Sequence, residues 1–403
     1  MRWAATRTMS QPWPSDASVN TPGLREAGRQ YRHFGALCLS AAAALTIAVP
    51  AAAAPAASPV LFNDSHFHLT NYVQQGTPIR DYLAIMGDKI GRSTLFGIPL
   101  QQQWDYANTG NFAPTYYLQS DAPLYYYSFT DAYIAMQYLS LAPAERARLD
   151  PMITGFDPAD MYAVDHIRRV LTTFPGVFSG IGEFSIHKEF VSAKIAGGPA
   201  SLTNPALDRI LDFAGEAGLV VILHNDIDAP FAKGDSLPNS LVQMRDLLLR
   251  HPNTTIIWAH TGLGRVVKPA AASAGGEIGE RSLAHLDVMD QLLDNPAMRH
   301  VYLDISWDEV AKYAVESPES IKRTADFIRH HQNRILFGTD NVAPKDQATQ
   351  LRVFDMWKPV FDLLTPEASY AVRIGNYNRL FDKARLDVRK WEKANVATVK
   401  ASK

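Results

Sequence analysis

Short apolar runs alternate with longer amphipathic segments along most of the chain, from residue 58 onward. The apolar runs cover residues 60–68, 93–100, 151–157, 177–186, 218–226, 254–262, 300–307 and 334–341. They are rich in β-branched and aliphatic residues and show little alternation of polar and apolar positions. That composition is typical of strands buried on both faces. The pattern therefore predicts a series of buried strands.

The segments between these runs have apolar residues at helical spacing and carry helix boundary signals. In residues 204–218, Asn204 is placed to act as the N-cap and Gly218 to end the helix. The last helix is expected over residues 365–382, with Thr365 at its N-cap. Strands and helices therefore alternate along the chain.

This alternation favours an α/β fold, a (β/α)8 TIM barrel over residues 58–385. A doubly wound open sheet is the competing architecture, and it would gather functional residues at one crevice instead of around a ring. Residues 101–150, dense in Tyr and Gln, are expected as a long insert after the second strand, and residues 263–280 as a loop insert after the sixth. In a barrel both inserts would lie at the catalytic face. Residues 386–403 are expected as a C-terminal tail.

The first 54 residues have a different composition and are predicted to be a signal peptide. An apolar stretch at residues 35–49 comes after Arg25, Arg29 and Arg32 and before a run of small residues, which is the order of regions in a secretory signal. The stretch is shorter than the about 20 apolar residues of a membrane-spanning helix. We therefore expect an exported protein, periplasmic or secreted, with no other membrane segment. An uncleaved N-terminal anchor is the alternative.

Composition narrows the chemistry further. Cys38, the single cysteine, lies in this apolar stretch, so the mature chain would bind a metal through His, Asp, Glu or a modified Lys and not through thiolates. The first 54 residues hold five arginines and two acidic residues, which leaves 34 Lys and Arg against 39 Asp and Glu in the rest. This balance does not resemble a basic nucleic-acid-binding surface. We expect a small-molecule substrate and no nucleic-acid partner.

Residues of metal-ligand type stand at the ends of five apolar runs. They are His66, His68, Glu183, His224, His260 and Asp340. Since successive strand residues point to opposite faces, His66 and His68 point the same way, into the barrel mouth, while Phe67 points toward the helices. A divalent ion needs imidazole and carboxylate groups that converge from several strands, and a closed barrel supplies that convergence.

Each of these residues also has an ordinary structural interpretation. A single histidine at a strand end is commonly a hydrogen-bonded core residue, Glu183 could pair with Lys188, and Asp340 could cap a helix. Their joint position on one concave face favours the metal site, because burying them unpaired would cost several kcal/mol. The expected cofactor is a divalent metal, with Zn²⁺ favoured, as one or two ions.

The motifs "DSHFH", "GIGE", "ILHND", "WAHTG" and "LFGTDN", in this order over residues 60–385, resemble the amidohydrolase superfamily and specifically its amidohydrolase-related members. The resemblance implies a (β/α)8 barrel and a metal-dependent hydrolase. It also implies a deeper metal site formed by His66, His68 and Asp340. His224 and His260 match the second site, and Glu183 matches the position that bridges the two ions, which favours a binuclear centre.

The leading hypothesis is hydrolysis by metal-activated water. Asp340 would orient or deprotonate the water, and His260 could change between ligand and oxyanion-stabilising roles. Arg265, Lys188, Trp307 and Gln102 are candidates for substrate binding.

Three alternatives stay open. A non-oxidative decarboxylase on the same barrel would use a single metal ion and an aromatic acid. A TatD-like nuclease is disfavoured by the acidic charge of the chain. A non-catalytic metal-binding barrel is disfavoured because structural sites seldom need six ligand residues. The Tyr-rich insert could wall a pocket or form the interface of a homo-oligomer.

Overall fold

The computed structural model describes residues 60–71, 76–98, 100–102, 124–126, 129–188, 201–227, 239–264, 270–272 and 281–401. These residues all fall in one compact unit, Ala56–Lys403. The predicted signal peptide, residues 1–54, lies outside the described residues. No described helix is long and apolar enough to cross a membrane.

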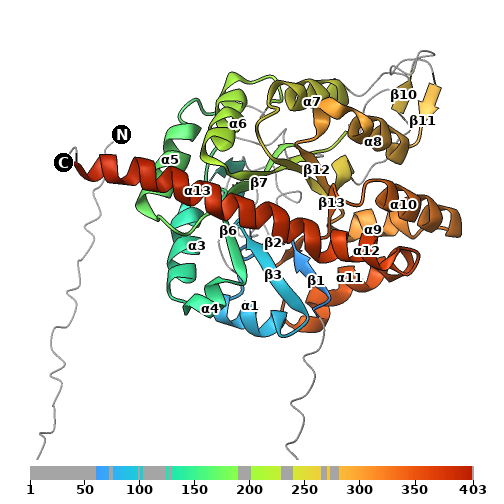
Figure 1. Ribbon diagram of the computed structural model, residues 1–403, viewed down its shortest axis with the longest axis horizontal. Coiled ribbons are helices and arrows are strands. Elements are labelled where there is room, and N and C mark those ends of the chain that lie inside the picture. The colour runs from blue at the N-terminus through green and yellow to red at the C-terminus, as the bar shows by residue number, and fades with distance from the viewer. Residues whose placement is uncertain are drawn as a thin grey trace, which may run out of the picture. The chain divides into compact units, whose positions relative to one another are not determined.

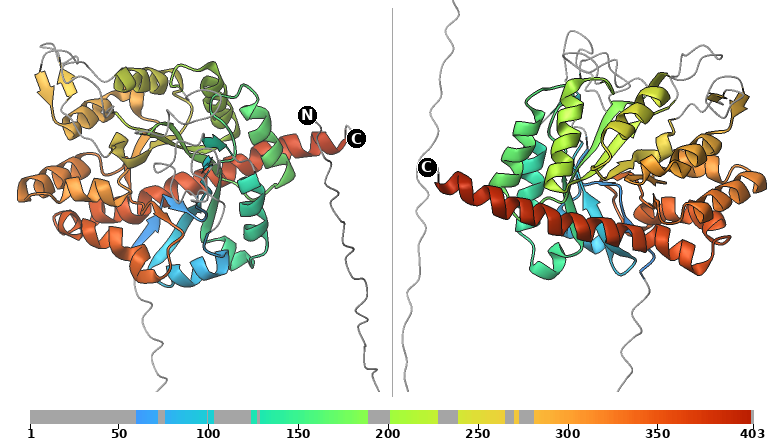
Figure 2. Two further views of the ribbon diagram at one scale, coloured as in Figure 1. Left: turned by 180° about the vertical axis from the view of Figure 1, so that it is seen from behind. Right: turned by 45° about the horizontal axis from the view of Figure 1, so that its top comes forward.

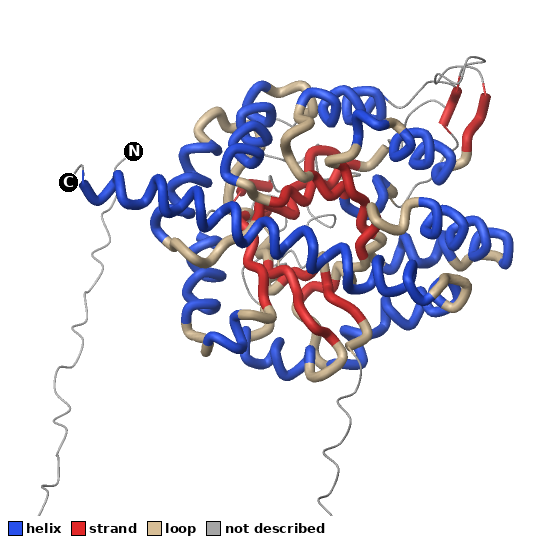
Figure 3. The backbone as a smooth tube through the Cα atoms, in the orientation of Figure 1, coloured by secondary structure: helices blue, strands red, loops and turns tan. Residues whose placement is uncertain are grey.

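The sheet is the predicted barrel of parallel strands. Its strands, in the order in which they pair, are β1 (Phe62–Asp64), β3 (Ile90–Leu95), β6 (Leu149–Ile153), β7 (Gly180–His187), β8 (Val220–Asn225), β9 (Ile256–Trp258), β12 (Val301–Asp304) and β13 (Ile335–Leu336). Two short parallel strands, β2 (Phe67–His68) and β14 (Asn341–Val342), pair where the last strand meets the first. The Ser65 N–H also donates to the Phe337 carbonyl. Figure 3 shows the resulting ring of strands within a ring of helices.

Helices alternate with the strands and cover the outside of the barrel (Figure 1). They are α1 (Ile79–Met86), α3 (Phe129–Leu139), α4 (Pro143–Arg146), α5 (Ala163–Thr173), α6 (Pro205–Ala217), α7 (Asn239–Arg250), α8 (His285–Asp294), α9 (Asp308–Ala314), α10 (Pro318–His330), α11 (Gln347–Phe361), α12 (Pro366–Tyr370) and α13 (Asn376–Ala401). The two predicted caps are present. The Asn204 side chain accepts from the Ala206 N–H, and the Thr365 side chain accepts from the Ala368 N–H.

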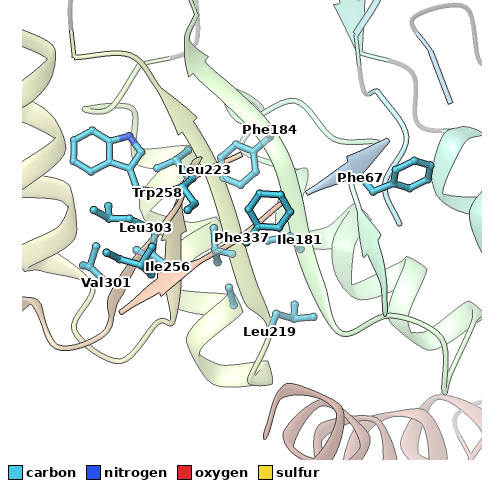
Figure 4. Packing of buried hydrophobic residues seen from close by; sticks show 14 of the residues in the cluster. Phe67, Ile181, Phe184, Leu219, Leu223, Ile256, Trp258, Val301, Leu303 and Phe337 are labelled. Atoms are coloured by element: carbon cyan, nitrogen blue, oxygen red, sulfur yellow. The ribbon is translucent and has the colours of Figure 1, made fainter. Parts of the chain in front are cut away.

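One apolar layer fills the space between the strands and the helices. Trp258, Leu223 and Phe184 belong to it, as Figure 4 shows. Phe67 lies in the same layer, where its ring stacks on Tyr82 of α1 with 3.7 Å between the ring centres. The prediction that Phe67 points away from the barrel interior is therefore confirmed.

A second apolar cluster fills the barrel interior below the polar residues. Strand residues such as Ile222 and Ile257 meet Tyr377, Leu380 and Phe381 of α13 there. Figures 1 and 2 show α13 crossing one end of the ring of strands. Helix α13 therefore closes the barrel at the end opposite the strands' carboxyl ends, and the other end is left for chemistry.

The segment expected as a C-terminal tail, 386–403, is helical as far as Ala401. Val388 and Trp391 are buried in it, and the Trp391 ring packs edge-on against Phe213 of α6. The predicted last helix, 365–382, is thus the first part of a longer structure that runs through α12, a π-helical turn (Ala371–Gly375) and α13.

Parts of both expected inserts are described. In the first, β4 (Leu100–Gln102) pairs antiparallel with β5 (Leu124–Tyr126). In the second, β10 (Ala270–Ala272) pairs antiparallel with β11 (Arg281–Leu283). The rest of the Tyr-rich segment and of the Gly/Ala-rich loop lies outside the described residues.

Candidate metal centre

The six residues predicted as metal ligands come together at the carboxyl ends of the barrel strands. They lie between β1 and β2 (His66), in β2 (His68), in β7 (Glu183), in β8 (His224), just after β9 (His260) and just after β13 (Asp340). They form two overlapping groups, and within each group the potential ligand atoms lie within 4.8 Å of one another. His66, His68, Glu183 and Asp340 form the first group; Glu183, His224 and His260 form the second.

The carboxylate of Glu183 lies between the two groups. Its Oε2 is 3.6 Å from His66 Nε2 and 3.4 Å from His68 Nε2. Its Oε1 accepts from His224 Nδ1 at 2.6 Å and lies 3.4 Å from His260 Nε2. Each oxygen therefore faces a different pair of histidines, as a bridging ligand would.

Asp340 closes the first group from the other side. Its Oδ1 is 3.4 Å from His66 Nε2 and 3.2 Å from His68 Nε2, while its Oδ2 is 3.9 Å from His260 Nε2. Its side chain is 11% exposed, against 0–5% for the other five. Asp340 is therefore the ligand-type residue nearest to the solvent-facing side of the centre.

Two glycines allow the strands to approach closely enough to form this geometry. Gly182 has a φ of 107°, and a Cβ there would lie 2.1 Å from the Ile222 carbonyl oxygen of the neighbouring strand. A Cβ on Gly338 would lie 2.7 Å from His66 Cβ. Each glycine stands within two positions of a ligand-type residue, Glu183 or Asp340, which explains the "GIGE" and "FGTD" motifs.

His260 lies in a strained turn directly after β9. The φ angles of His260 and Thr261 are 56° and 54°, a region that non-glycine residues rarely occupy. The turn is held by its neighbours: the His260 N–H donates to Asp304 Oδ1 at 2.9 Å, and Nδ1 pairs with Ser306 Oγ at 2.8 Å. Asp340 has a φ of 54° as well. Strain of this kind persists only where surrounding contacts enforce it, and it is common at functional sites.

Asp304 and Asp226 are site residues that the sequence did not reveal. Asp304, at the end of β12, accepts from His66 Nδ1 at 3.0 Å. Asp226 pairs with His224 Nε2 at 2.8 Å. Carboxylates that hold the second nitrogen of a histidine orient the ring and raise its basicity. Asp304 had one available signal, because it is the acid in the seventh apolar run, for which no ligand was assigned.

The charges of the centre depend strongly on one another. Burial would lower the pKa of His66, but the carboxylates of Asp304 and Glu183 outweigh burial and place that pKa well above its usual value. Burial would raise the pKa of Asp340, but His260, His68 and His66 hold it below the ordinary range. Without an ion, the centre thus keeps a protonated His66 among ionised carboxylates.

A family model described as amidohydrolase matches residues 64–382. The chain belongs to the amidohydrolase family. It is thus a metal-dependent hydrolase by family, as the five motifs predicted. No curated protein matches it.

Solved structures resemble this amidohydrolase at low sequence identity. A Pseudomonas putida protein provisionally named 2-pyrone-4,6-dicarboxylic acid hydrolase is 15% identical, with a TM-score of 0.46 and coverage of 80% of this chain and 98% of that one. A 2,6-dihydroxybenzoate decarboxylase is 15% identical, with a TM-score of 0.40 and coverage of 62% and 75%. A zinc-bound amidohydrolase from Burkholderia multivorans is 12% identical, with a TM-score of 0.45 and coverage of 80% and 99%.

The donor set of the amidohydrolase fits a divalent metal ion. His66 Nε2 and His260 Nε2 are buried, and neither has a hydrogen-bond partner among the described residues. A buried polar atom without a partner costs about 1–3 kcal/mol. Imidazole nitrogens and carboxylate oxygens are the ligands that ions such as Zn²⁺ accept, so an ion here would satisfy both nitrogens.

The predicted substrate-binding residues are placed less fully. Lys188 Nζ lies 3.8 Å from Glu183 Oε1, and the Trp307 ring lies 5.2 Å from the His260 ring. Gln102 belongs to β4, and its side chain is outside the description. Arg265 lies outside the described residues.

Asp64 supports the first strand from behind the histidines. It accepts from the Thr339 N–H at 2.9 Å, from Thr339 Oγ1 at 2.7 Å and from Gln350 Nε2 at 2.8 Å. Burial raises the pKa of Asp64 to about 6. Asp64 thus joins the beginning of the barrel to its end, directly beneath the metal centre.

Proposed function

We propose that this amidohydrolase is an exported enzyme that hydrolyses an ester, lactone, amide or related bond of a small molecule. The observation that carries the proposal is the position of Glu183, whose two oxygens face two different pairs of histidines. This position supports a centre for two divalent ions, which we propose to be Zn²⁺. When bound, such ions lower the pKa of a water and polarise the oxygen of the bond to be cleaved.

The side chains divide the work of holding the ions. His66, His68 and Asp340 would hold one ion, His224 and His260 the second, and Glu183 both. Asp304 and Asp226 fix the rings of His66 and His224, so that less ordering is needed when an ion binds. The burial of these residues excludes bulk water from all but the Asp340 side.

Asp340 is the proposed general base. Its Oδ1 faces His66 and His68, whereas its Oδ2 has no histidine nitrogen closer than 3.9 Å in the printed contacts. Because the surrounding histidines keep the pKa of Asp340 low, the carboxylate is ionised at neutral pH. We propose that Oδ2 accepts a proton from the attacking water and passes it to the leaving group.

The test combines metal analysis with activity. The purified protein is analysed for bound metal and screened against esters, lactones, amides and phosphoesters. His66→Ala combined with His68→Ala should remove both metal and activity. Asp340→Asn should lower kcat by about 10²–10⁴-fold, whereas Asp165→Asn, an exposed residue of α5, should leave it unchanged. Full activity of a metal-free preparation would overturn the proposal.

One observation favours a second candidate, a decarboxylase with a single ion. Both ring nitrogens of His224 are already engaged, Nδ1 with Glu183 and Nε2 with Asp226. If His224 keeps both bonds, the second group loses a ligand and one ion remains. A metal content of one per chain together with CO₂ release from an aromatic acid would select this candidate over hydrolysis.

The export part of the proposal rests on residues 1–54 alone. We expect bacterial cells that express the full chain to yield a processed protein outside the cytoplasm that lacks about the first 54 residues. Mass determination of the secreted or periplasmic protein measures the cleavage point. An intact N-terminus on a cytoplasmic protein would remove this part and leave the hydrolase proposal standing.

A further inference from the structure

A cavity of about 340 Å³ lies outside the barrel, away from the metal centre. Helices α8, α9 and α10 supply most of its wall, with Trp357 of α11 and Ile305, which follows β12, completing it. None of the six ligand-type residues lines it. Its volume falls in the range of small-molecule sites, about 300–1,000 Å³.

The wall is mostly apolar and ranges from buried to open. Ile305, Phe327 and Trp357 are 1–2% exposed, whereas Ala284 and Glu319 are exposed. Arg323 also lines the cavity, but its guanidinium already pairs with the carboxylates of Asp287 and Asp290. An apolar wall without an unbalanced charge favours an uncharged occupant.

Trp357 presents an unsatisfied donor in this wall. Its Nε1 is buried and has no hydrogen-bond partner among the described residues. Buried Trp N–H groups usually find a partner, and an unpartnered one costs about 1–3 kcal/mol. An oxygen atom of a bound molecule would remove that cost.

His285 presents the complementary acceptor. Its Nε2 lies 2.8 Å from the Thr261 carbonyl oxygen, and because a carbonyl only accepts, Nε2 is the protonated nitrogen. In the neutral ring, Nδ1 is then left with a lone pair. Burial lowers the pKa of His285 to about 4, so the ring stays neutral at physiological pH.

We propose that this cavity is a binding site for a small, uncharged molecule with an apolar body and one hydroxyl group, of the phenol type. A hydroxyl oxygen can accept from Trp357 Nε1, and its proton can be donated to His285 Nδ1. The ring would fill the apolar space beside Ile305 and Phe327. The site is separate from the metal centre and does not depend on the function proposed for it.

The test measures binding of 4-fluorophenol to the full-length protein by ¹⁹F NMR, with and without a chelator. Wild type should show saturable binding at one site that the chelator does not remove. Ala314→Leu, which fills the cavity from α9, should weaken binding at least tenfold. Ala348→Leu is the matched control, since Ala348 is exposed on α11 and does not line the cavity.

Equal binding by wild type and Ala314→Leu, no saturable binding, or loss of binding with the metal would each overturn the proposal. A second variant tests the polar contact. Wild type should prefer 4-fluorophenol to 4-fluorotoluene, and Trp357→Phe should reduce that preference about threefold to tenfold, as expected for one hydrogen bond. An unchanged preference would remove Trp357 from the site. If Trp357→Phe does not fold, the Ala314→Leu comparison still decides.

Discussion

At the residue scale, the centre depends on side chains that touch no ion. Asp304 accepts from His66 Nδ1, from the His260 N–H and from the Ser306 N–H. The first contact turns His66 Nε2 toward Glu183 and Asp340, and the second holds the strained turn at His260. One buried carboxylate thus positions a residue in each ligand group.

We expect Asp304→Asn to lower metal affinity about 10–100-fold, which is the usual cost of losing such a partner. Competition with a chromogenic chelator measures the affinity. Asp308→Asn is the control, because Asp308 lies four positions further along, where it pairs with Lys312 on the surface. Equal affinities for the two variants would show that Asp304 does not position the ligands.

Metal binding should release protons, and its affinity should fall with falling pH. The pKa of His66 is raised well above 6.5 in the ion-free centre, so His66 is protonated at neutral pH and an ion must displace that proton. Calorimetry at pH 7 in two buffers of different ionisation enthalpy measures the release. Asp304→Asn should release fewer protons, because Asp304 is a main cause of the raised pKa. No release from wild type would contradict the prediction.

The sequence indicated the ligand-type residues because each stands at the end of an apolar run. It could not indicate that Asp304 supports His66, because the two residues are 238 positions apart and no spacing rule relates them. The strain at His260 and Asp340 was also beyond reach, since the left-handed backbone there is imposed by neighbouring strands. Local patterns therefore identified candidate ligands but not their supports.

At the element scale, helix α13 both fills and fastens the lower end of the barrel. Tyr377, Leu380 and Phe381 enter the barrel interior. Beside them, Tyr377 Oη donates to buried Asp150 at 2.8 Å, and Arg385 Nε donates to it at 2.6 Å. The continuation of α13 past residue 385 was readable in principle, because Phe381, Ala384, Val388 and Trp391 have helical spacing. The many charges around them masked that pattern.

We expect Asp150→Ala to lower the free energy of unfolding by about 3–5 kcal/mol, because it leaves Arg92 and Arg385 without their buried partner. Urea denaturation measures the change. Asp382→Ala removes the exposed partner of the same Arg92 and should cost less than about 1 kcal/mol. Similar losses for both variants would mean that the buried carboxylate does not anchor α13.

At the scale of the whole molecule, the metal centre and the barrel closure coincide. Asn341 of β14 pairs with Phe67 of β2, and the Asp340 N–H donates to the His66 carbonyl at 2.8 Å. Ligand-type residues from the first and last strands thus meet at the seam of the barrel. An ion bound there would tie the two ends of the sheet together.

Removal of metal should therefore lower the thermal unfolding midpoint. For a free ion at about 1,000 times its Kd, binding contributes about 4 kcal/mol to stability. Differential scanning calorimetry with and without a chelator measures the shift. The combined His66→Ala and His68→Ala variant is the control and should not respond to the chelator. An equal shift in that variant would mean that the chelator acts elsewhere.

The bonds between Asp64 and Thr339 span 275 positions of the chain. A ribosome must therefore complete most of the polypeptide before the strand that carries His66 can meet its last partner. Premature termination anywhere before Asp340 leaves the first ligand group incomplete. Acquisition of the metal is thus a late event in the life of the molecule, which follows synthesis and does not guide its early steps.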